Sequence, residues 1–534
     1  MTAITPFDLY QKLKKARYSD TDKELWEFYE DSYFGGQDYK EGKYLYKYEN
    51  ESSDRYTYRL LVTPYTNQCA PIIDLYTSYL FKKPIKRVWG SLDKDELFQM
   101  FLDNADNQGN SYEQVMKRSA TLSGIYGIIF AFLDTPTYDS EQVTSLQAQI
   151  DNKIYPYMTL MEPEDVLSWG MARDTVTGKM GLSWVKIEQE GEEAKDWMSD
   201  TADQCYVVIW KKEGWEKYAL NKKDSSAVLD KEGANPAKTI PIVPIYNLRG
   251  EELMEGLSDI RDIANLNRLH YCHGSSAIQV IDNSAFAMIV IPAEIGADGK
   301  EVKTVTVGPG YSVTETPETK NITRYVEPLL NTVGIVREER KEIEKQITTL
   351  AQMGGVAAIE GMRNFPSGEA LKISNQPLNT LLTNKAQNIE DAECNIIRNW
   401  LMWRYSGDVV KVDSIMSEVE IEYPDEFDID SLASELDILT KMIAAKYPEE
   451  TLKEKQKELL PMIFPNMESE EQAIQETAID ANTINAMAAL AKAIPQPPQM
   501  TPPDKMLSDN MVKIGKDAPP PVGQMAHIVP RGDM

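Results

Sequence analysis

The sequence contains few of the residues from which metal and redox sites are usually built. Among 534 residues there are 3 histidines and 4 cysteines, and the cysteines lie far apart without a CxxC pair. Zinc ribbons and thioredoxin-like motifs need such pairs, and disulfide scaffolds need denser cysteine, so the first two classes are excluded and the third is disfavoured. We therefore expect a reducing environment.

Long apolar segments are absent as well. No uninterrupted apolar run reaches the roughly 18 residues that a membrane-spanning helix requires. Residues 1–6 show neither the basic nor the apolar part of a signal peptide. We expect the protein in the cytoplasm or in an assembled particle, without a membrane contact.

Positive charge is scarce relative to negative charge. Lys and Arg number 56 and Asp and Glu number 84, so the formal net charge is −28. Proteins that coat nucleic acids bind phosphates through Lys and Arg, and the acid excess disfavours that class. Apolar residues make up 42% and charged residues 26%, which is an ordinary globular composition. The length allows about three or four domains or one elongated subunit.

The motifs of common catalytic sites are missing. The sequence contains no GxxxxGK[ST], no GxGxxG after a predicted strand, no GxSxG and no HExxH. We expect no enzymatic activity, no cofactor and no metal. The many carboxylates leave a carboxylate-dependent metal enzyme as an alternative, although no cluster has the spacing of a two-metal site.

Three local features have both a binding and a structural interpretation. Residues 103–115 superficially resemble a calcium loop, but no register places the required ligands, so an Asn/Gly-rich turn is the favoured interpretation. His270 and His273 share one face of a predicted helix and would need a third ligand to hold a metal; otherwise they form a polar stripe. The basic residues within 82–87 either contact phosphate or form a solvated turn.

A cationic stripe occurs further along the chain. Arg337, Lys341 and Lys345 lie at intervals of four in a predicted helix, with glutamates on either side. Ion pairs on a helix surface contribute only about 0.3–0.5 kcal/mol each. The stripe is therefore either a solubilising face or a functional surface.

Hydrophobic periodicity divides the chain into a mixed N-terminal region, long helices and an acidic C-terminal region. Residues 6–33 are predicted to be helical with a break at Ser19–Asp20, and residues 240–246, with two prolines, to form an edge strand at best. Other strands are predicted at 126–133, 155–161, 166–171, 182–188, 206–210 and 215–220. Long helices are predicted at 251–283, 330–353 and 368–405, the last kinked at Pro377.

The order of these segments, together with short motifs, resembles the portal proteins of tailed bacteriophages. The motifs are LYTSYLFKKPIK at 75–86, EPEDVLSW at 162–169, the start of a helix from Gly250, and SGEALK at 367–372. The last is similar to the small-Gly-x-Ala-Leu-Lys sequence that opens the tunnel helix in that family. The resemblance covers residues 75–405.

The resemblance implies an α+β portal fold with an α/β wing, two long stem helices, a small β-containing clip, a kinked tunnel helix and a helical crown. The implied boundaries are 1–250 for the wing, 251–283 and 330–353 for the stem helices, 284–329 for the clip, 354–367 for the tunnel loop, 368–427 for the tunnel helix and its return to the wing, 428–493 for the crown and 494–534 for a disordered tail.

The resemblance also implies a function. Portal subunits close into a ring, usually of twelve copies, at one capsid vertex, and double-stranded DNA is packaged and ejected through its channel. The implied partners are the major capsid protein, the terminase large subunit and head–tail adaptor proteins, and the implied location is the virion, with assembly in the host cytoplasm. A virion scaffold protein that is not a portal is an alternative.

Candidate site residues follow from that function. The DNA-channel candidates are Arg337, Lys341, Lys345, Met353, Met362, Arg363 and Phe365. The tunnel-loop hinges are Gly354, Gly355, Gly361 and Gly368, because glycine permits backbone conformations that other residues rarely adopt.

Overall fold

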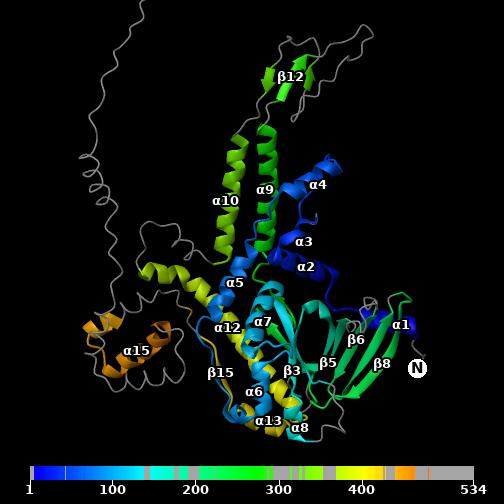
Figure 1. Cartoon of the computed structure of the whole chain (residues 1–534), viewed down its shortest axis with the longest axis vertical. Helices are drawn as coiled ribbons and strands as arrows, with labels where there is room; N and C mark the ends of the chain where they lie inside the picture. The colour runs from blue at the N-terminus through cyan, green and yellow to red at the C-terminus, as the bar shows by residue number, and fades with distance from the viewer. Residues whose placement is uncertain are drawn as a thin grey trace, which may run out of the picture. The chain divides into compact units, whose positions relative to one another are not determined.

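The computed structural model describes most of the chain. The described residues are 5–41, 44–136, 145–173, 178, 180–190, 204–221, 223–285, 288–292, 313–315, 324–326, 331–352, 368–424, 427, 439–463 and 479. The chain divides into two compact units, Met1–Ile429 and Asp430–Met534. The fold is mixed α+β, as expected from the sequence, and its sheets are mainly antiparallel (Figure 1).

Short helices form much of the N-terminal region. They are α1 (Pro6–Lys14), α2 (Asp20–Phe34), α3 (Gly36–Lys40), α4 (Ser53–Val62), α5 (Cys69–Leu80), α6 (Glu96–Asp103), α7 (Tyr112–Tyr126) and α8 (Leu146–Asp151). The predicted break before α2 is confirmed, because Ser19 caps that helix and exchanges hydrogen bonds with Asp22. Ser111 and Gln114 form the same kind of capping box at the start of α7.

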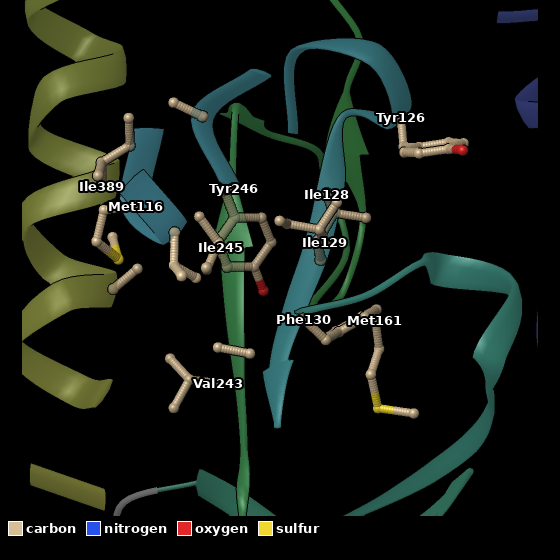
Figure 2. Packing of buried hydrophobic residues seen from close by; sticks show 14 of the residues in the cluster. Met116, Tyr126, Ile128, Ile129, Phe130, Met161, Val243, Ile245, Tyr246 and Ile389 are labelled. Carbon is tan, nitrogen blue, oxygen red and sulfur yellow. The ribbon is translucent and has the colours of Figure 1, made fainter. Parts of the chain in front are cut away.

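A three-stranded antiparallel sheet lies in the main core. Its order is β3 (Tyr157–Met161), β2 (Ile128–Asp134) and β9 (Ile242–Tyr246). The edge position predicted for β9 is confirmed, since among the described strands β9 pairs with β2 alone. Figure 2 shows Met116 of α7, Ile245 of β9 and Ile389 of a later helix in the apolar layer on this sheet. The central strand is buried along almost its whole length, which explains its continuous apolar run.

A five-stranded antiparallel meander lies between β3 and β9 in the chain. Its strands are β4 (Val166–Arg173), β5 (Met180–Glu190), β6 (Gln204–Lys211), β7 (Gly214–Asn221) and β8 (Ser226–Ala234). Helix α1 packs on it through a small apolar cluster that includes Leu13, Val207 and Leu220. Lys186 donates to the carbonyl oxygens of Lys12 and Lys15, at 3.0 and 2.6 Å, and so places a cation at the C-terminal end of α1.

Two long helices pack against each other in antiparallel fashion. They are α9 (Ile263–Ala285) and α10 (Asn331–Leu350). The chain between them contains a three-stranded sheet of β12 (Met288–Pro292), β13 (Val313–Glu315) and β14 (Arg324–Val326). A third long helix, α12 (Gly368–Arg404), contains Pro377. These three helices were predicted from the sequence, with one correction to the first.

The first long helix begins at Ile263, not at residue 251 as the apolar spacing predicts. Residues 256–257 form the short strand β11 (Gly256–Leu257), which pairs with β10 (Leu248–Arg249). Gly256 lies so close to Gly127 that a β-carbon on Gly256 would be 2.0 Å from the Gly127 carbonyl oxygen. Met254 has a φ of 66°, which a right-handed helix cannot contain. Pairing with the core therefore overrides the helical spacing in residues 251–262.

The end of the first unit returns to the N-terminal region. After α12 come α13 (Val409–Met416) and β15 (Glu420–Glu422), and β15 pairs antiparallel with β1 (Lys86–Val88). Two 3₁₀ helices, η1 (Gly90–Lys94) and η2 (Pro163–Asp165), complete this unit. In the second unit, α15 (Glu449–Ile463) packs through Leu452 and Leu459 against Leu439, which lies in helical residues 439–444.

Candidate functional site in the paired helices α9 and α10

A buried polar contact joins the two long helices. The Nε atom of Arg340 on α10 donates to Nε2 of His270 on α9 at 3.1 Å, and Oε1 of Glu344 lies 3.0 Å from the same nitrogen. His270 is only 1% exposed. Arg340 also passes beside Gly274, one turn further along α9, where a β-carbon would be in ordinary van der Waals contact with its Cζ atom at 3.7 Å. The register of α9 on α10 is thus defined by specific polar atoms as well as by apolar packing.

Burial lowers the pKa of His270 below its usual 6.5, and the neighbouring Arg340 guanidinium and His273 act in the same direction. The Glu344 carboxylate opposes this effect but is half exposed. His270 is therefore neutral in the folded protein at pH 7 and accepts a hydrogen bond. Among the described residues no group of three or more His, Cys, Asp and Glu side chains could hold a metal ion. The polar-stripe interpretation of the histidines accounts for the contacts of His270.

A second buried cluster connects α9 and α10 with α12. Lys385 of α12 forms an ion pair with Asp259, which precedes α9, and their side chains are 3% and 1% exposed. The Lys385 ammonium also lies 4.8 Å from the ring centre of Tyr76. The Tyr76 hydroxyl in turn donates to the carbonyl oxygen of Ala351, directly after α10, at 2.5 Å. Segments far apart in sequence therefore meet at one cluster of polar groups.

The predicted cationic stripe lies on the exposed surface of α10. Arg337, Lys341 and Lys345 are all exposed. Lys345 approaches Glu342 at 3.8 Å, and its side chain is 75% exposed. The structure thus brings the three cations together on one side of a helix, as the spacing of four residues predicts, without assigning them a ligand.

Most of the other candidate residues lie outside the described part of the chain. These are Met353, Gly354, Gly355, Gly361, Met362, Arg363 and Phe365. Gly368 is described, and it is the first residue of α12. The structure therefore describes the residues on either side of the predicted tunnel loop, namely the turn after α10 and the first turn of α12.

The basic cluster at 82–87 has a structural role that its sequence did not reveal. Arg87 contacts Glu393 of α12 with Nε to Oε1 at 2.6 Å, and the Glu393 side chain is fully buried. The Tyr423 hydroxyl donates to the second carboxylate oxygen at 2.7 Å. Lys86, next to Arg87, pairs with the exposed Glu422 at 2.8 Å. The interpretation as a solvated turn is wrong for the strand Lys86–Val88, and no local sequence signal indicates its partner strand.

The loop that resembled a calcium site is a turn stabilised by its own side chains. The Oδ1 atom of Asp106 accepts hydrogen bonds from the backbone N–H groups of Gln108 and Asn110, at 2.9 and 3.2 Å. Asn110 also donates its side-chain amide to the second carboxylate oxygen at 2.6 Å. Asp106 is thus occupied by protein donors, and these hydrogen bonds lower the pKa of its carboxyl group against the effect of burial.

Comparisons with known proteins leave the family open. No protein-family model matches the sequence, and no curated protein matches it. Solved structures with low similarity come from gene transfer agent (GTA) particles. The neck of an empty GTA particle computed with C6 symmetry aligns at a TM-score of 0.35 and 13% identity, over 71% of this chain and 87% of that chain.

Two further GTA structures align in a similar way. The virion of a native GTA particle gives a TM-score of 0.34 at 13% identity over 71% of this chain and 87% of that chain. The neck of a native GTA particle computed with C12 symmetry aligns at a TM-score of 0.31 and 13% identity, over 70% of this chain and 84% of that chain. TM-scores this low do not establish a common fold, so these similarities carry no functional conclusion.

None of the helices in the described ranges combines the length and the apolar character that crossing a membrane requires.

Proposed function

We propose that this chain is a subunit of a ring-shaped channel for double-stranded DNA, similar to the portal of a tailed bacteriophage. The observation that supports the proposal is the order and pairing of elements in the first unit. An α/β region is followed by α9, a small sheet and the antiparallel α10, and α12 then returns to the core of that α/β region. This is the arrangement that the sequence resemblance implies for wing, stem, clip and tunnel helix.

The physical chemistry of the chain is compatible with a channel through which DNA slides. Each basic contact to phosphate adds salt-dependent affinity, so a strongly basic wall would hold DNA in place. The chain has a net charge of −28, and such a charge repels a polyanion overall. A few exposed cations can guide DNA without binding it tightly.

The proposed channel elements are the paired helices α9 and α10, the segment 353–367 and the start of α12 at Gly368. Glycines within 353–367 would let that segment adapt to DNA, and its Met353, Met362, Arg363 and Phe365 are candidate contacts. Arg337, Lys341 and Lys345 would lie in the same ring of helices. Each cation of this stripe can face either DNA in the channel or an acidic surface of a neighbouring copy.

The proposed subdomains and partners follow from the same function. Residues 1–250 would form the wing that contacts the major capsid protein, and residues 284–329 the clip that binds the terminase large subunit and later the head–tail adaptor proteins. Residues 428–493 would form the crown. The protein would act at one vertex of a virion, in about twelve copies and without enzymatic activity of its own.

The direct test is the oligomeric state of the purified full-length protein. We expect native mass measurement to give a multiple of the 60.5 kDa chain, near twelve copies, and negative-stain images to show rings with a central hole wide enough for duplex DNA. Monomers at high concentration, or filaments, would contradict the proposal. Magnesium-dependent nuclease activity of the same preparation would favour the metal-enzyme alternative instead.

A further inference from the structure

Helix α10 has three distinct faces along its length. Arg340, Ile343 and Ile347 face α9, and the two isoleucines are buried. The second face is the cationic stripe of Arg337, Lys341 and Lys345. The third face, which we call the mixed stripe, consists of exposed residues at helical intervals of four and three: Ile335, Glu339, Glu342, Gln346 and Leu350.

The cationic stripe and the mixed stripe lie on opposite flanks of the helix over residues 335–341, and they approach each other further along, where Lys345 is 3.8 Å from Glu342. Each residue turns an α-helix by about 100°, so residues two apart point about 160° away from each other. Glu339 lies two residues from both Arg337 and Lys341, and Ile335 lies two residues before Arg337. A single surface cannot contact both flanks of α10 at once.

Both stripes lack partners within the described part of the chain. Among the described residues, Arg337, Lys341 and Glu339 form no ion pair. One ion pair joins the two stripes, between Lys345 and Glu342 at 3.8 Å, and both of its side chains are more than half exposed. On the mixed stripe, Ile335 is 60% exposed and Leu350 is 50% exposed. These two apolar side chains lie at opposite ends of the mixed stripe and form no contiguous apolar patch, so the stripe is mainly a polar and acidic surface.

The charges of the two flanks are complementary to each other. The flank with the three cations also carries Glu338 and Glu344, each three residues from Lys341, which gives 3 − 2 = +1, and the other flank carries Glu339 and Glu342, which gives −2. Over the whole helix, four Lys and Arg and four Glu give 4 − 4 = 0 net charge. A wall that bound a polyanion would have a surplus of positive charge, whereas α10 pairs positive charge on one side with negative charge on the other.

We propose that the cationic stripe of one copy lies against the mixed stripe of the next copy in a ring. This inference rests on the proposed function and specifies it, because it assigns the three cations to the contact between copies and not to DNA. In a ring with more than two members, each subunit contacts its two neighbours through two different surfaces. Opposite flanks with opposite charge meet that requirement. A two-fold dimer uses one self-complementary surface, so it could engage only one flank.

Charge reversal on each flank tests the contact. Variant A is Arg337→Glu with Lys341→Glu, and variant B is Glu339→Lys with Glu342→Lys. Each variant alone carries the same sign of charge on both flanks, and juxtaposed like charges strongly disfavour association. We therefore expect the fraction of chain in rings to fall about tenfold or more in each variant. The control, Lys212→Glu with Lys231→Glu, makes the same change in net charge as variant A at exposed positions of the five-stranded sheet and should assemble normally.

Mixing A and B provides the decisive measurement. The acidic flank of A then meets the basic flank of B at every contact, so an equimolar mixture should recover rings with alternating subunits, visible by native mass measurement. Recovery also excludes misfolding as the cause of the single-variant losses. If variant A or variant B has a lower unfolding midpoint than the unmodified chain, the same two positions are changed to Gln instead. These neutral variants should lose a smaller fraction of rings than the charge reversals.

The possible outcomes separate this inference from the proposed function. If the unmodified chain forms no rings, the proposed function fails. If the unmodified chain, A and B all form rings, the ring stands and the flank contact is overturned. The contact is likewise overturned if A forms rings normally but retains DNA differently in filled particles, because the cations then face DNA.

Discussion

At the scale of single residues, buried ion pairs connect segments that are distant in sequence. Arg87 with Glu393 and Lys385 with Asp259 are such pairs, and both are mostly or fully removed from solvent. Arg59 and Glu51, only eight residues apart, form a further buried pair. Removing charges from water is costly, and such pairs persist only when each group is neutralised and hydrogen-bonded. Loss of one partner therefore leaves an uncompensated buried charge, whereas an exposed charge that loses its partner is solvated by water.

Arg87 provides the test at this scale. Replacing Arg87 with Met retains an unbranched aliphatic stem but leaves the Glu393 carboxylate without its cation, so the free energy of unfolding should fall by about 3–5 kcal/mol. The matched control is Lys86→Met on the same strand, whose ion pairs are exposed and whose loss should have no measurable effect. Denaturant unfolding of both variants measures the difference. Equal effects would show that burial of the Arg87–Glu393 pair is not what stabilises this junction.

At the scale of elements, the pair α9 and α10 combines apolar packing with the His270 contact. Because the pKa of His270 is lowered by burial and by Arg340, the unfolded chain binds a proton that the folded chain does not, in the interval between the folded pKa and about 6.5. Stability from this group is complete above about pH 6.5 and falls as the pH drops through that interval. Glu344 and His273 are the other titratable groups beside it.

His270→Gln tests that linkage. The glutamine side-chain oxygen can accept from Arg340 but does not titrate, so the difference in free energy of unfolding between the unmodified chain and the variant should be constant at neutral and alkaline pH. Below about pH 6.5 the difference should shift in favour of the variant. Thermal unfolding at a series of pH values measures it, and taking the difference removes the contribution of the carboxyl groups common to both proteins. A constant difference down to pH 5 would contradict the proposed linkage.

Elements also mark the limit of prediction from local pattern. The long helices, the buried strand β2 and the edge strand β9 follow from periodicity and from the positions of prolines. Strand β8 escapes prediction because it is largely exposed and lacks a clear apolar alternation. The start of α9 is mispredicted because the close approach of Gly127 and Gly256 is a contact between distant residues, which spacing along one segment cannot reveal.

At the scale of the whole molecule, the chain consists of two compact units. The first unit includes β15 and Tyr423, which complete contacts with β1 and with Glu393 of α12. We therefore expect a chain ending at Ile429 to fold, with an unfolding midpoint for this unit within about 3 °C of that in the full chain, a shift that corresponds to about 1 kcal/mol.

A chain ending at Arg404 is the comparison for that prediction. It lacks α13, β15 and Tyr423, so β1 loses its partner strand and Glu393 loses a hydrogen-bond donor. Its unfolding transition should occur at a clearly lower temperature or be lost. If both shortened chains behave alike, residues 405–429 do not contribute to the first unit as their contacts indicate.

Some features of the candidate site could be predicted from the sequence, and others required the tertiary structure. The cationic stripe could be predicted, because a spacing of four residues places side chains on one side of any helix. The position of this stripe relative to the mixed stripe and to α9 could not be predicted. Which face of α10 packs on α9 depends on contacts of Arg340 and Ile343 that form only in the folded structure. The channel-loop candidates within 353–367 stay predictions, since they lie outside the described residues.

The sequence by itself determined where the long helices and buried strands lie, since periodicity and proline placement act through local geometry. It also determined which catalytic motifs are missing. The tertiary structure decided which charges are buried in pairs, where α9 begins and which flanks of α10 are exposed. These properties arise from contacts between residues distant in sequence, from 70 positions for Arg340 and His270 to 306 for Arg87 and Glu393, and the desolvation of a charge depends on the partner that folding brings to it.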